Sequence, residues 1–209
     1  TAYQGAETKA VIGDKNIIRE FVTIHRGTKE GTATTIGNGN YLMAYAHLAH
    51  NCQIGSQCIL VNGATLGGYC TVEDGAFISG LTVVHQFTRI GRLALVSGLS
   101  AVNMDIPPYM ICGGRGSIVY ALNLIGLRRA GIRGETRDDI KRAFKLLYQS
   151  GLSVTNALAE IEKMCTAPEV KYLVEFVRRS KRGICRGGTP TEARELVVQL
   201  ERRSSLSDD

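Results

Sequence analysis

Several residue types and patterns are scarce in this chain. It contains no tryptophan and four prolines among 209 residues, and aromatic residues make up 6% of it. No apolar run approaches the roughly 18 residues that a membrane-spanning helix needs, and no signal-peptide pattern stands at the beginning, so we expect neither a span nor secretion. The six cysteines include no CxxC pair. We therefore expect reduced packing residues in a cytoplasmic protein, and no disulfide or zinc framework.

The charge balance raises the question of an acidic partner. The formal net charge is +6 and the pI is near 9.1. The first half has no basic run with interleaved aromatics, so nucleic acid is not the expected partner. The positive charge gathers later, in two groups: Arg128, Arg129, Arg133 and Arg137, and then Arg178, Arg179, Lys181, Arg182 and Arg186. Such groups fit either a solvated helical face or a docking surface for a phosphate-bearing ligand or an acidic carrier protein.

A period of six organises the first half of the chain. An aliphatic residue stands at every sixth position: Ile36, Leu42, Leu48, Ile54, Leu60, Leu66, Val72, Ile78, Val84, Ile90, Val96 and Val102. A mostly small residue follows four positions after each: Asn40, Ala46, Cys52, Cys58, Ala64, Cys70, Ala76, Thr82, Thr88, Ala94 and Ser100. An α-helix needs a period of 3.6 and a half-buried strand a period of two. A period of six is typical of the hexapeptide repeat of a parallel β-helix.

The repeat predicts the shape of the β-helix. Three hexads close one triangular coil, and each coil adds about 4.8 Å, the spacing of paired strands. The phase runs back to Ile12, so we expect about five coils before Pro107 and Pro108 end the sheet. Residues 29–35 replace one hexad and are expected to loop outside. Glycines directly after the aliphatic, such as Gly37 and Gly67, are expected to occupy turns with unusual φ and ψ. Because the repeat is already running within a dozen residues of Thr1, we expect earlier coils to be missing.

The period becomes helical after an irregular glycine-rich segment at residues 112–117. We predict helices from Thr136 to Tyr148, after Ser153, and from Pro168 onward. A last helix is expected at residues 191–203 and a disordered tail at 204–209. The predicted organisation is therefore a β-helix over residues 1–110 and a linker with an α-helical C-terminal domain over residues 111–209.

All four histidines lie within the repeat. Leu48, Leu66 and Val84 are spaced by eighteen, so His50 and His85 should project near one flank of the prism, with Tyr69 on the coil between. Imidazoles beside polar residues at a groove suggest a general base. Surface histidines without a role are the alternative.

Six segments together resemble one enzyme family. They are TIHRGT (23–28), AHLAHNC (46–52), NGATLGGY (62–69), GLTVVHQF (80–87), DIPPY (105–109) and NLIGLRRAG (123–131). They resemble the bacterial UDP-N-acetylglucosamine O-acyltransferases, which begin lipid A biosynthesis with 3-hydroxyacyl groups from acyl carrier protein. The resemblance implies a left-handed β-helix, a helical C-terminal domain and a cytoplasmic homotrimer with active sites between subunits. It implies no cofactor and no metal.

The resemblance also implies roles for individual residues. His50 matches the catalytic base, and Gly68 matches the position whose backbone N–H stabilises the oxyanion. Gly98 matches the floor of the acyl groove. The positions matching substrate contacts are His47, Asn51, Tyr69, His85, Gln86, Asn123 and Arg129, of which Asn123 and Arg129 match those holding the uridine diphosphate.

Four positions depart from the family pattern. Asn51 replaces an aspartate after the base, Tyr69 replaces a histidine, Ile125 replaces an acidic residue, and Ala130 replaces the second of a basic pair. They put the nucleotide contacts and the acceptor atom, hydroxyl or amine, in question. The acyl length and the activity of the chain as given also stay open.

Two alternative activities remain at this point, and a non-catalytic hexapeptide scaffold is a third possibility if essential coils are missing. One is a related hexapeptide transferase, using N-acyl transfer or a coenzyme A donor. The other is a β-helix carbonic anhydrase, whose zinc is held by three histidines shared between subunits, here His47, His50 and His85.

Overall fold

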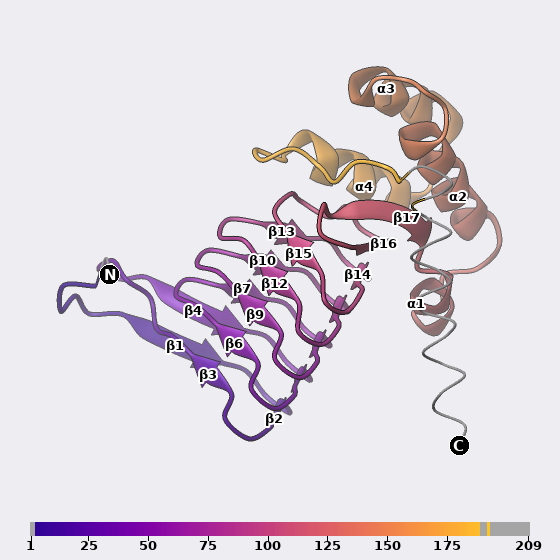
Figure 1. The fold of residues 1–209 in the computed structure, drawn as a ribbon. Helices are drawn as coiled ribbons and strands as arrows, with labels where there is room; N and C mark the ends of the chain where they lie inside the picture. The colour runs from indigo at the N-terminus through magenta and orange to yellow at the C-terminus, as the bar shows by residue number, and fades with distance from the viewer. Residues whose placement is uncertain (1–2, 189–191, 193–209) are drawn as a thin grey trace.

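The first half of the molecule is a stack of coils. The structure, a computed structural model, describes residues 3–188 and Glu192. Short strands alternate with tight turns along the stack, and the helices gather at its far end from the N-terminus (Figure 1). The strands form three faces, each a sheet of parallel strands.

Face A holds β1 (Lys9–Ile12), β4 (Ala33–Ile36), β7 (Gln53–Ile54), β10 (Thr71–Val72) and β13 (Arg89–Ile90). Face B holds β2 (Ile17–Ile18), β5 (Tyr41–Leu42), β8 (Ile59–Leu60), β11 (Phe77–Ile78) and β14 (Leu95–Val96). Face C holds β3 (Thr23–Ile24), β6 (His47–Leu48), β9 (Thr65–Leu66), β12 (Val83–Val84) and β15 (Ala101–Val102).

The strand register reproduces the repeat. Leu48 pairs with Leu66, and Leu66 with Val84, which is the predicted eighteen-residue step. Ile24 pairs with Leu48, so the first coil is one hexad longer. The predicted insertion is real, but its predicted extent is wrong. Only residues 29–32 form the excursion, because Ala33–Ile36 pairs with β1 as strand β4.

The repeating aliphatics make the core. Leu42, Leu48, Leu60 and Leu66 have no exposed surface, and the small residues between them are buried as predicted. All six cysteines are free and buried, which confirms that they pack as thiols. Burial raises the pKa of Cys58 to about 12, so this thiol is inert near neutral pH.

The positions directly after the aliphatic residues require glycine for a different reason from the one predicted. Gly37 and Gly67 do not have positive φ; the left-handed residues lie two positions later, at Gly39 and Tyr69. A Cβ on Gly37 would lie 2.6 Å from the Gly55 carbonyl oxygen, and one on Gly67 would lie 2.7 Å from the Gln86 nitrogen. These positions therefore need glycine because neighbouring coils approach too closely for a side chain.

The coils end where the prolines were expected to end them, but face B continues. β16 (Met110–Gly113) pairs with β14, and β17 (Ile118–Leu122) returns antiparallel to β16. The glycine-rich segment, predicted to be irregular, is thus largely the turn of a β-hairpin. The division into domains at residue 110 stays a prediction.

Four helices follow the hairpin: α1 (Leu124–Arg129), α2 (Gly134–Tyr148), α3 (Val154–Met164) and α4 (Pro168–Arg178). The predictions for α2, α3 and α4 are confirmed, with α2 beginning two residues earlier than expected. Ser153 caps α3 through a bond from the Asn156 N–H. Helix α1 was not predicted. The predicted helix at 191–203 and the tail at 204–209 lie outside the described residues apart from Glu192.

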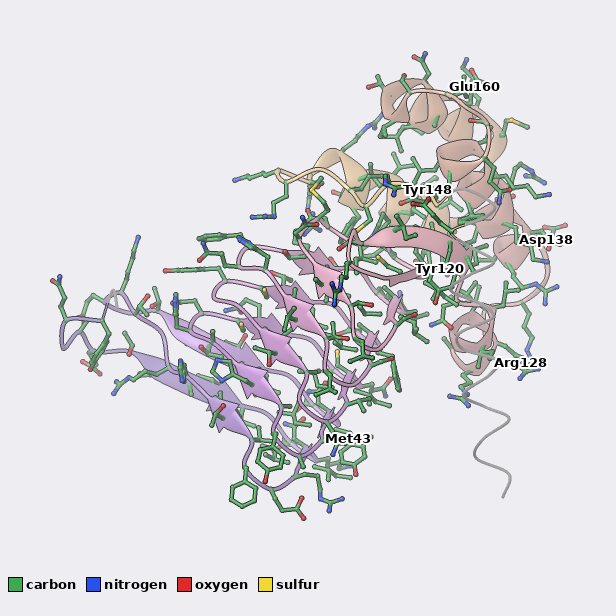
Figure 2. All side chains as sticks on the ribbon, in the orientation of Figure 1. Met43, Tyr120, Arg128, Asp138, Tyr148 and Glu160 are labelled. Atoms are coloured by element: carbon green, nitrogen blue, oxygen red, sulfur yellow. The ribbon has the colours of Figure 1, made fainter. Side chains whose placement is uncertain are left out.

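The helical part is tied to the coils through two carboxylates. Tyr172 of α4 donates its hydroxyl hydrogen to Glu73 at 2.7 Å, and Arg89 donates to the same carboxylate at 3.3 Å. Asp105, 1% exposed, accepts from the Ser180 hydroxyl at 2.7 Å. Gly187, which forms a bridge with Val119 of β17, lies against Tyr148 of α2: a Cβ on Gly187 would stand 3.2 Å from the Tyr148 ring (Figure 2). These contacts fix the basic segment after α4 beside the coils. Within the described part of the chain, no helix has the length and apolarity that crossing a membrane requires.

Candidate active site between the coils and helix α4

His50, Gly68 and Gln86 occupy equivalent positions on three consecutive coils. Each stands two residues after a buried face C aliphatic, and the register of face C stacks these aliphatics directly. The turns that join face C to face A, here named the C–A corner, therefore carry all three residues. The sequence predicted His50 and His85 near one flank with Tyr69 between, whereas the register makes Gln86 the residue equivalent to His50, with Gly68 between them.

The His50 imidazole is held through its Nδ1 atom. Nδ1 lies 3.1 Å from the Asn51 Oδ1 atom, which also accepts from the Thr28 hydroxyl at 3.0 Å. Asn51 is 6% exposed and adopts φ +62°, a left-handed conformation that asparagine tolerates. With Oδ1 facing the ring, the hydrogen sits on Nδ1 and the lone pair on Nε2. That tautomer is the one a general base needs.

Gly68 touches the imidazole directly. A Cβ built on Gly68 would lie 2.6 Å from His50 Cε1 and 2.8 Å from Nε2. The Gly68 carbonyl accepts from the Phe87 N–H at 2.9 Å, whereas no acceptor within residues 3–188 takes the Gly68 N–H. A free backbone donor therefore lies beside the basic edge of the ring.

Two aromatic rings continue the wall past His50. Tyr69 meets the imidazole edge-on, with ring centroids 5.3 Å apart, and stacks on Phe87 at 5.0 Å. The Tyr69 and Phe87 rings also line one side of a groove of about 970 Å³, here named the basic groove. Its other lining residues are Thr71, Arg89, Asp105, Arg178, Arg179, Ser180, Lys181 and Arg182. The second basic group of the sequence thus faces the corner that carries His50.

His85 and Gln86 are joined to the basic groove by Arg182. His85 Nδ1 lies 3.1 Å from the Gln86 carbonyl oxygen. Arg182 donates to that oxygen at 3.1 Å and to the Asn103 carbonyl at 3.0 Å. A segment far along the sequence therefore holds the turn that contains both predicted contact residues.

His47 lies on the outer side of β6, directly before the buried Leu48. Its Nδ1 is 2.7 Å from the Thr23 hydroxyl, and its ring meets His25 edge-on at 4.7 Å. The pKa of His47 is lowered, first by partial removal of the ring from water and then by repulsion from His25. The neutral ring is therefore favoured.

Three predicted residues lie outside this corner. Gly98 belongs to the turns that join face B to face C, and the nearest atom to a Cβ there would be the Gly80 oxygen at 3.3 Å. Asn123 caps α1 by accepting from the Gly126 N–H, and its amide donates to the Leu93 carbonyl. Arg129 ends α1, where its labelled neighbour Arg128 lies apart from the coils (Figure 2). One chain does not bring these residues to His50.

The four histidines of one chain do not gather around a common point. Over residues 3–188, no three His, Cys, Asp or Glu side chains converge on a point that could hold an ion. A zinc held by His47, His50 and His85 would need ligands from a second copy of the chain.

Sequence reasoning missed three residues of the site: Thr28, Phe87 and Arg182. Thr28 and Phe87 stand inside the segments TIHRGT and GLTVVHQF, so the motifs contained them without indicating their contacts. Arg182 was expected in the second basic group, as a docking residue for an acidic carrier, but its bonds to the Gln86 and Asn103 carbonyls were not predicted.

Family profiles and curated relatives that match this chain come from one group of enzymes. Residues 105–185 match the family profile described as UDP N-acetylglucosamine O-acyltransferase, domain 2, and residues 33–68 match the bacterial transferase hexapeptide profile. The acyl-[acyl-carrier-protein]–UDP-N-acetylglucosamine O-acyltransferase of Gloeothece citriformis is 46% identical over 85% of this chain. This chain spans 64% of that relative's length. The enzyme of the same name from Halorhodospira halophila is 44% identical over 88% of this chain and 72% of its own.

Solved structures agree. The UDP-N-acetylglucosamine acyltransferase from Bacteroides fragilis superposes with a TM-score of 0.84 at 41% identity, covering 88% of this chain and 72% of the other. The Arabidopsis enzyme gives 0.85 at 36% identity, covering 88% and 68%. Coils of opposite hand would not superpose, so the coils of this chain have the same hand as those of the solved structures. The predicted fold class, a parallel β-helix of hexapeptide repeats followed by helices, is confirmed.

Proposed function

Because the chain belongs to the UDP-N-acetylglucosamine O-acyltransferase family, we propose that it transfers a 3-hydroxyacyl group from acyl carrier protein to the 3-hydroxyl of UDP-N-acetylglucosamine. This is the first step of lipid A biosynthesis. The observation that carries the proposal is the pairing of the His50 ring, held through Nδ1, with the free N–H of Gly68.

The reaction follows from these two groups. His50 Nε2 removes the proton from the sugar hydroxyl as the oxygen attacks the thioester carbonyl, because an alcohol becomes a strong nucleophile only while it is being deprotonated. The Gly68 N–H donates to the oxyanion of the tetrahedral intermediate. The intermediate then expels the thiolate, which takes the proton back from the imidazolium. Asn51 orients the ring without adding a charge that would stabilise the imidazolium.

The remaining predicted residues would hold the substrates. We assign His47, Tyr69, His85 and Gln86 to contacts near the reacting sugar and acyl group, and Gly98 to the floor of the acyl groove. Arg129 would hold nucleotide phosphate, where a guanidinium grips two oxygens at once. The Asn123 amide already makes two bonds within the chain, so its contact with the nucleotide would use its remaining hydrogen-bonding capacity.

A homotrimer would complete the site. Gly98 and His50 stand at different corners of one chain, and α1 is apart from both, so one complete site requires a neighbouring copy. The corner that carries Gly98 exposes large apolar side chains: Phe21, Tyr45, Leu81 and Leu99 are 72%, 63%, 64% and 55% exposed. Apolar surface of this kind favours contact with another subunit.

The basic groove would receive the carrier. Arg178, Arg179, Lys181 and Arg182 lie at its rim beside Tyr69, within reach of a phosphate-bearing arm and an acidic protein surface. The six free thiols fit a reducing compartment, and we place the protein in the cytoplasm.

One assay tests the function. The purified chain is incubated with UDP-N-acetylglucosamine and 3-hydroxyacyl carrier protein, and the products are identified by mass spectrometry. We expect a UDP-sugar heavier by one 3-hydroxyacyl group. Parallel reactions contain the 3-amino sugar nucleotide or a coenzyme A thioester. A product only with the amine, or only with coenzyme A, would replace the proposal by N-acyl transfer or by a related hexapeptide transferase.

A further inference from the structure

Side chains from three consecutive coils meet behind the His50 ring. Thr28 comes from the first coil, Asn51 from the second and Tyr69 from the third. The Thr28 hydroxyl oxygen lies 3.0 Å from Asn51 Oδ1 and 3.3 Å from the Tyr69 hydroxyl. Thr28 and Asn51 are 7% and 6% exposed, so water competes little for these bonds. The arrangement is a short chain of hydroxyl and amide groups that ends on Nδ1 of His50.

The orientation of the Asn51 amide decides which imidazole nitrogen is basic. With Oδ1 toward the ring, Nδ1 carries hydrogen and Nε2 carries the lone pair. A flipped amide would present N–H to Nδ1, move the hydrogen to Nε2 and leave no base at the edge beside Gly68. Unlike a carboxylate, which accepts from either oxygen, an asparagine does not fix this choice by itself. Some other group must favour one orientation.

The Thr28 hydroxyl supplies that preference. A hydroxyl has one hydrogen, and a phenol is the more acidic of the two hydroxyls, so Tyr69 donates to Thr28. Thr28 then uses its own hydrogen on Asn51, which therefore presents Oδ1. Hydrogen-bond donation therefore runs from Tyr69 to Thr28 and from Thr28 to Asn51 Oδ1. His50 Nδ1–H donates to the same Asn51 Oδ1 atom.

We propose that Thr28, with Tyr69 behind it, is a positioning residue that fixes the Asn51 amide and thereby keeps the lone pair of His50 on Nε2. The proposal rests on the proposed function for its kinetic consequence, but the tautomer itself does not depend on which reaction is catalysed.

The test is the imidazole tautomer, measured by NMR on protein labelled with ¹⁵N-histidine. The chain has four histidines, and His50→Gln identifies the His50 signal. Spectra are recorded as a pH series, and the tautomer is read where the ¹⁵N shifts of the His50 ring no longer change with rising pH. Thr28→Val removes the hydroxyl and keeps the shape, Thr28→Ser keeps the hydroxyl, and Tyr69→Phe removes only the terminal O–H.

We expect the Nδ1–H tautomer in the unaltered protein and in Thr28→Ser. In Thr28→Val a measurable Nε2–H fraction should appear, with a smaller fraction in Tyr69→Phe. Turnover in Thr28→Val should fall about five- to tenfold, as for one lost hydrogen bond, while KM for the nucleotide sugar changes little. Recovery of turnover in Thr28→Ser distinguishes the hydroxyl from a packing effect.

Two results would overturn the proposal. One is an Nε2–H tautomer in the unaltered protein, and the other is a Thr28→Val protein whose His50 keeps the Nδ1–H tautomer throughout. If Thr28→Val does not fold, the tautomer of His50 in Tyr69→Phe is the deciding measurement. An unchanged tautomer in that variant would show that donation from Tyr69 through Thr28 does not orient Asn51. If no variant and no parent transfers an acyl group, the proposed function fails, while the NMR result still decides the positioning role.

Discussion

Gly68 lies against the His50 ring so closely that no side chain fits between them: its Cβ would stand 2.6 Å from Cε1. Gly68→Ala should therefore push the imidazole away while leaving the backbone N–H in place. Displacing a catalytic group by about 1 Å costs on the order of 10² in rate, so we expect at least that loss in turnover. Gly116→Ala is the matched control, because a Cβ there meets nothing within 4 Å. A Gly68→Ala enzyme as active as this control would separate Gly68 from the mechanism.

Replacing the base itself should have a larger effect on turnover than on binding. His50→Gln removes the Nε2 lone pair and should lower kcat by about 10² to 10⁴, the usual range for a positioned general base. Affinity for UDP-N-acetylglucosamine, measured by calorimetry, should change little. Near-normal kcat in this variant would mean that another group takes the proton.

The pKa of His47 gives a third prediction. Because desolvation and His25 lower it, NMR titration should find it below the ordinary histidine value, and His25→Ala should raise it. The folded protein then binds fewer protons than the unfolded chain, so this residue's contribution to stability is present above the unfolded pKa of about 6.5 and is lost as pH falls. Denaturant unfolding at pH 7.5 and pH 5.5 should show that His47→Gln reduces the acid-induced loss. A pKa of His47 that does not respond to His25→Ala would contradict the assigned repulsion.

Docking of an acidic carrier at the basic groove predicts a salt-dependent KM. Arg178 pairs with Glu162 and Arg179 with Glu175, while Lys181 has no ionic partner within the described part of the chain. Lys181→Gln should therefore raise KM for the carrier substrate and weaken its salt dependence, without changing KM for the nucleotide sugar. The measurement spans about 0.1 to 1 M salt, where the Debye length shrinks from about 10 to about 3 Å. Lys163→Gln, on α3 and paired with Glu160, is the control. Kinetics that ignore salt in the parent enzyme would favour a small thioester donor.

The sequence predicted the features that depend on local repetition. A six-residue period with a small residue at each corner defines the coil, because every repeat meets the same neighbours one coil away. It therefore placed Leu48, Leu66 and Val84 in one column, with His50 on the flank beside them. The helices beginning at Ser153 and Pro168 were also predictable, because capping is decided within one turn.

The features that were missed depend on contacts between distant segments. Arg182 binds the Gln86 carbonyl across 96 residues, and no local pattern distinguishes it from its charged neighbours. The hairpin β16–β17 exists because β14 offers a free edge to β16, which the glycine-rich sequence does not reveal. Thr28 reaches Asn51 across neighbouring coils, 23 residues apart in the sequence, and no local pattern indicates this contact. Periodicity thus placed the base but not the groups that orient it.

The last prediction concerns acyl length. Gly98 matches the family position at the floor of the acyl groove, and without a side chain it leaves that groove long. A Cβ at this position would stand 3.3 Å from the Gly80 oxygen, so a larger side chain fits only by extending outward, where the groove would run.

Gly98→Met would place a flexible apolar plug there and exclude the terminal methylenes of a long chain. Each excluded methylene forfeits about 0.8 kcal/mol of burial, or about fourfold in kcat/KM. We therefore expect the parent to prefer a long 3-hydroxyacyl carrier substrate and Gly98→Met to prefer a shorter one, with Gly116→Met unchanged as control. Rates across a series of acyl lengths decide the matter, and an unaltered preference in Gly98→Met would mean that the groove ends at other residues.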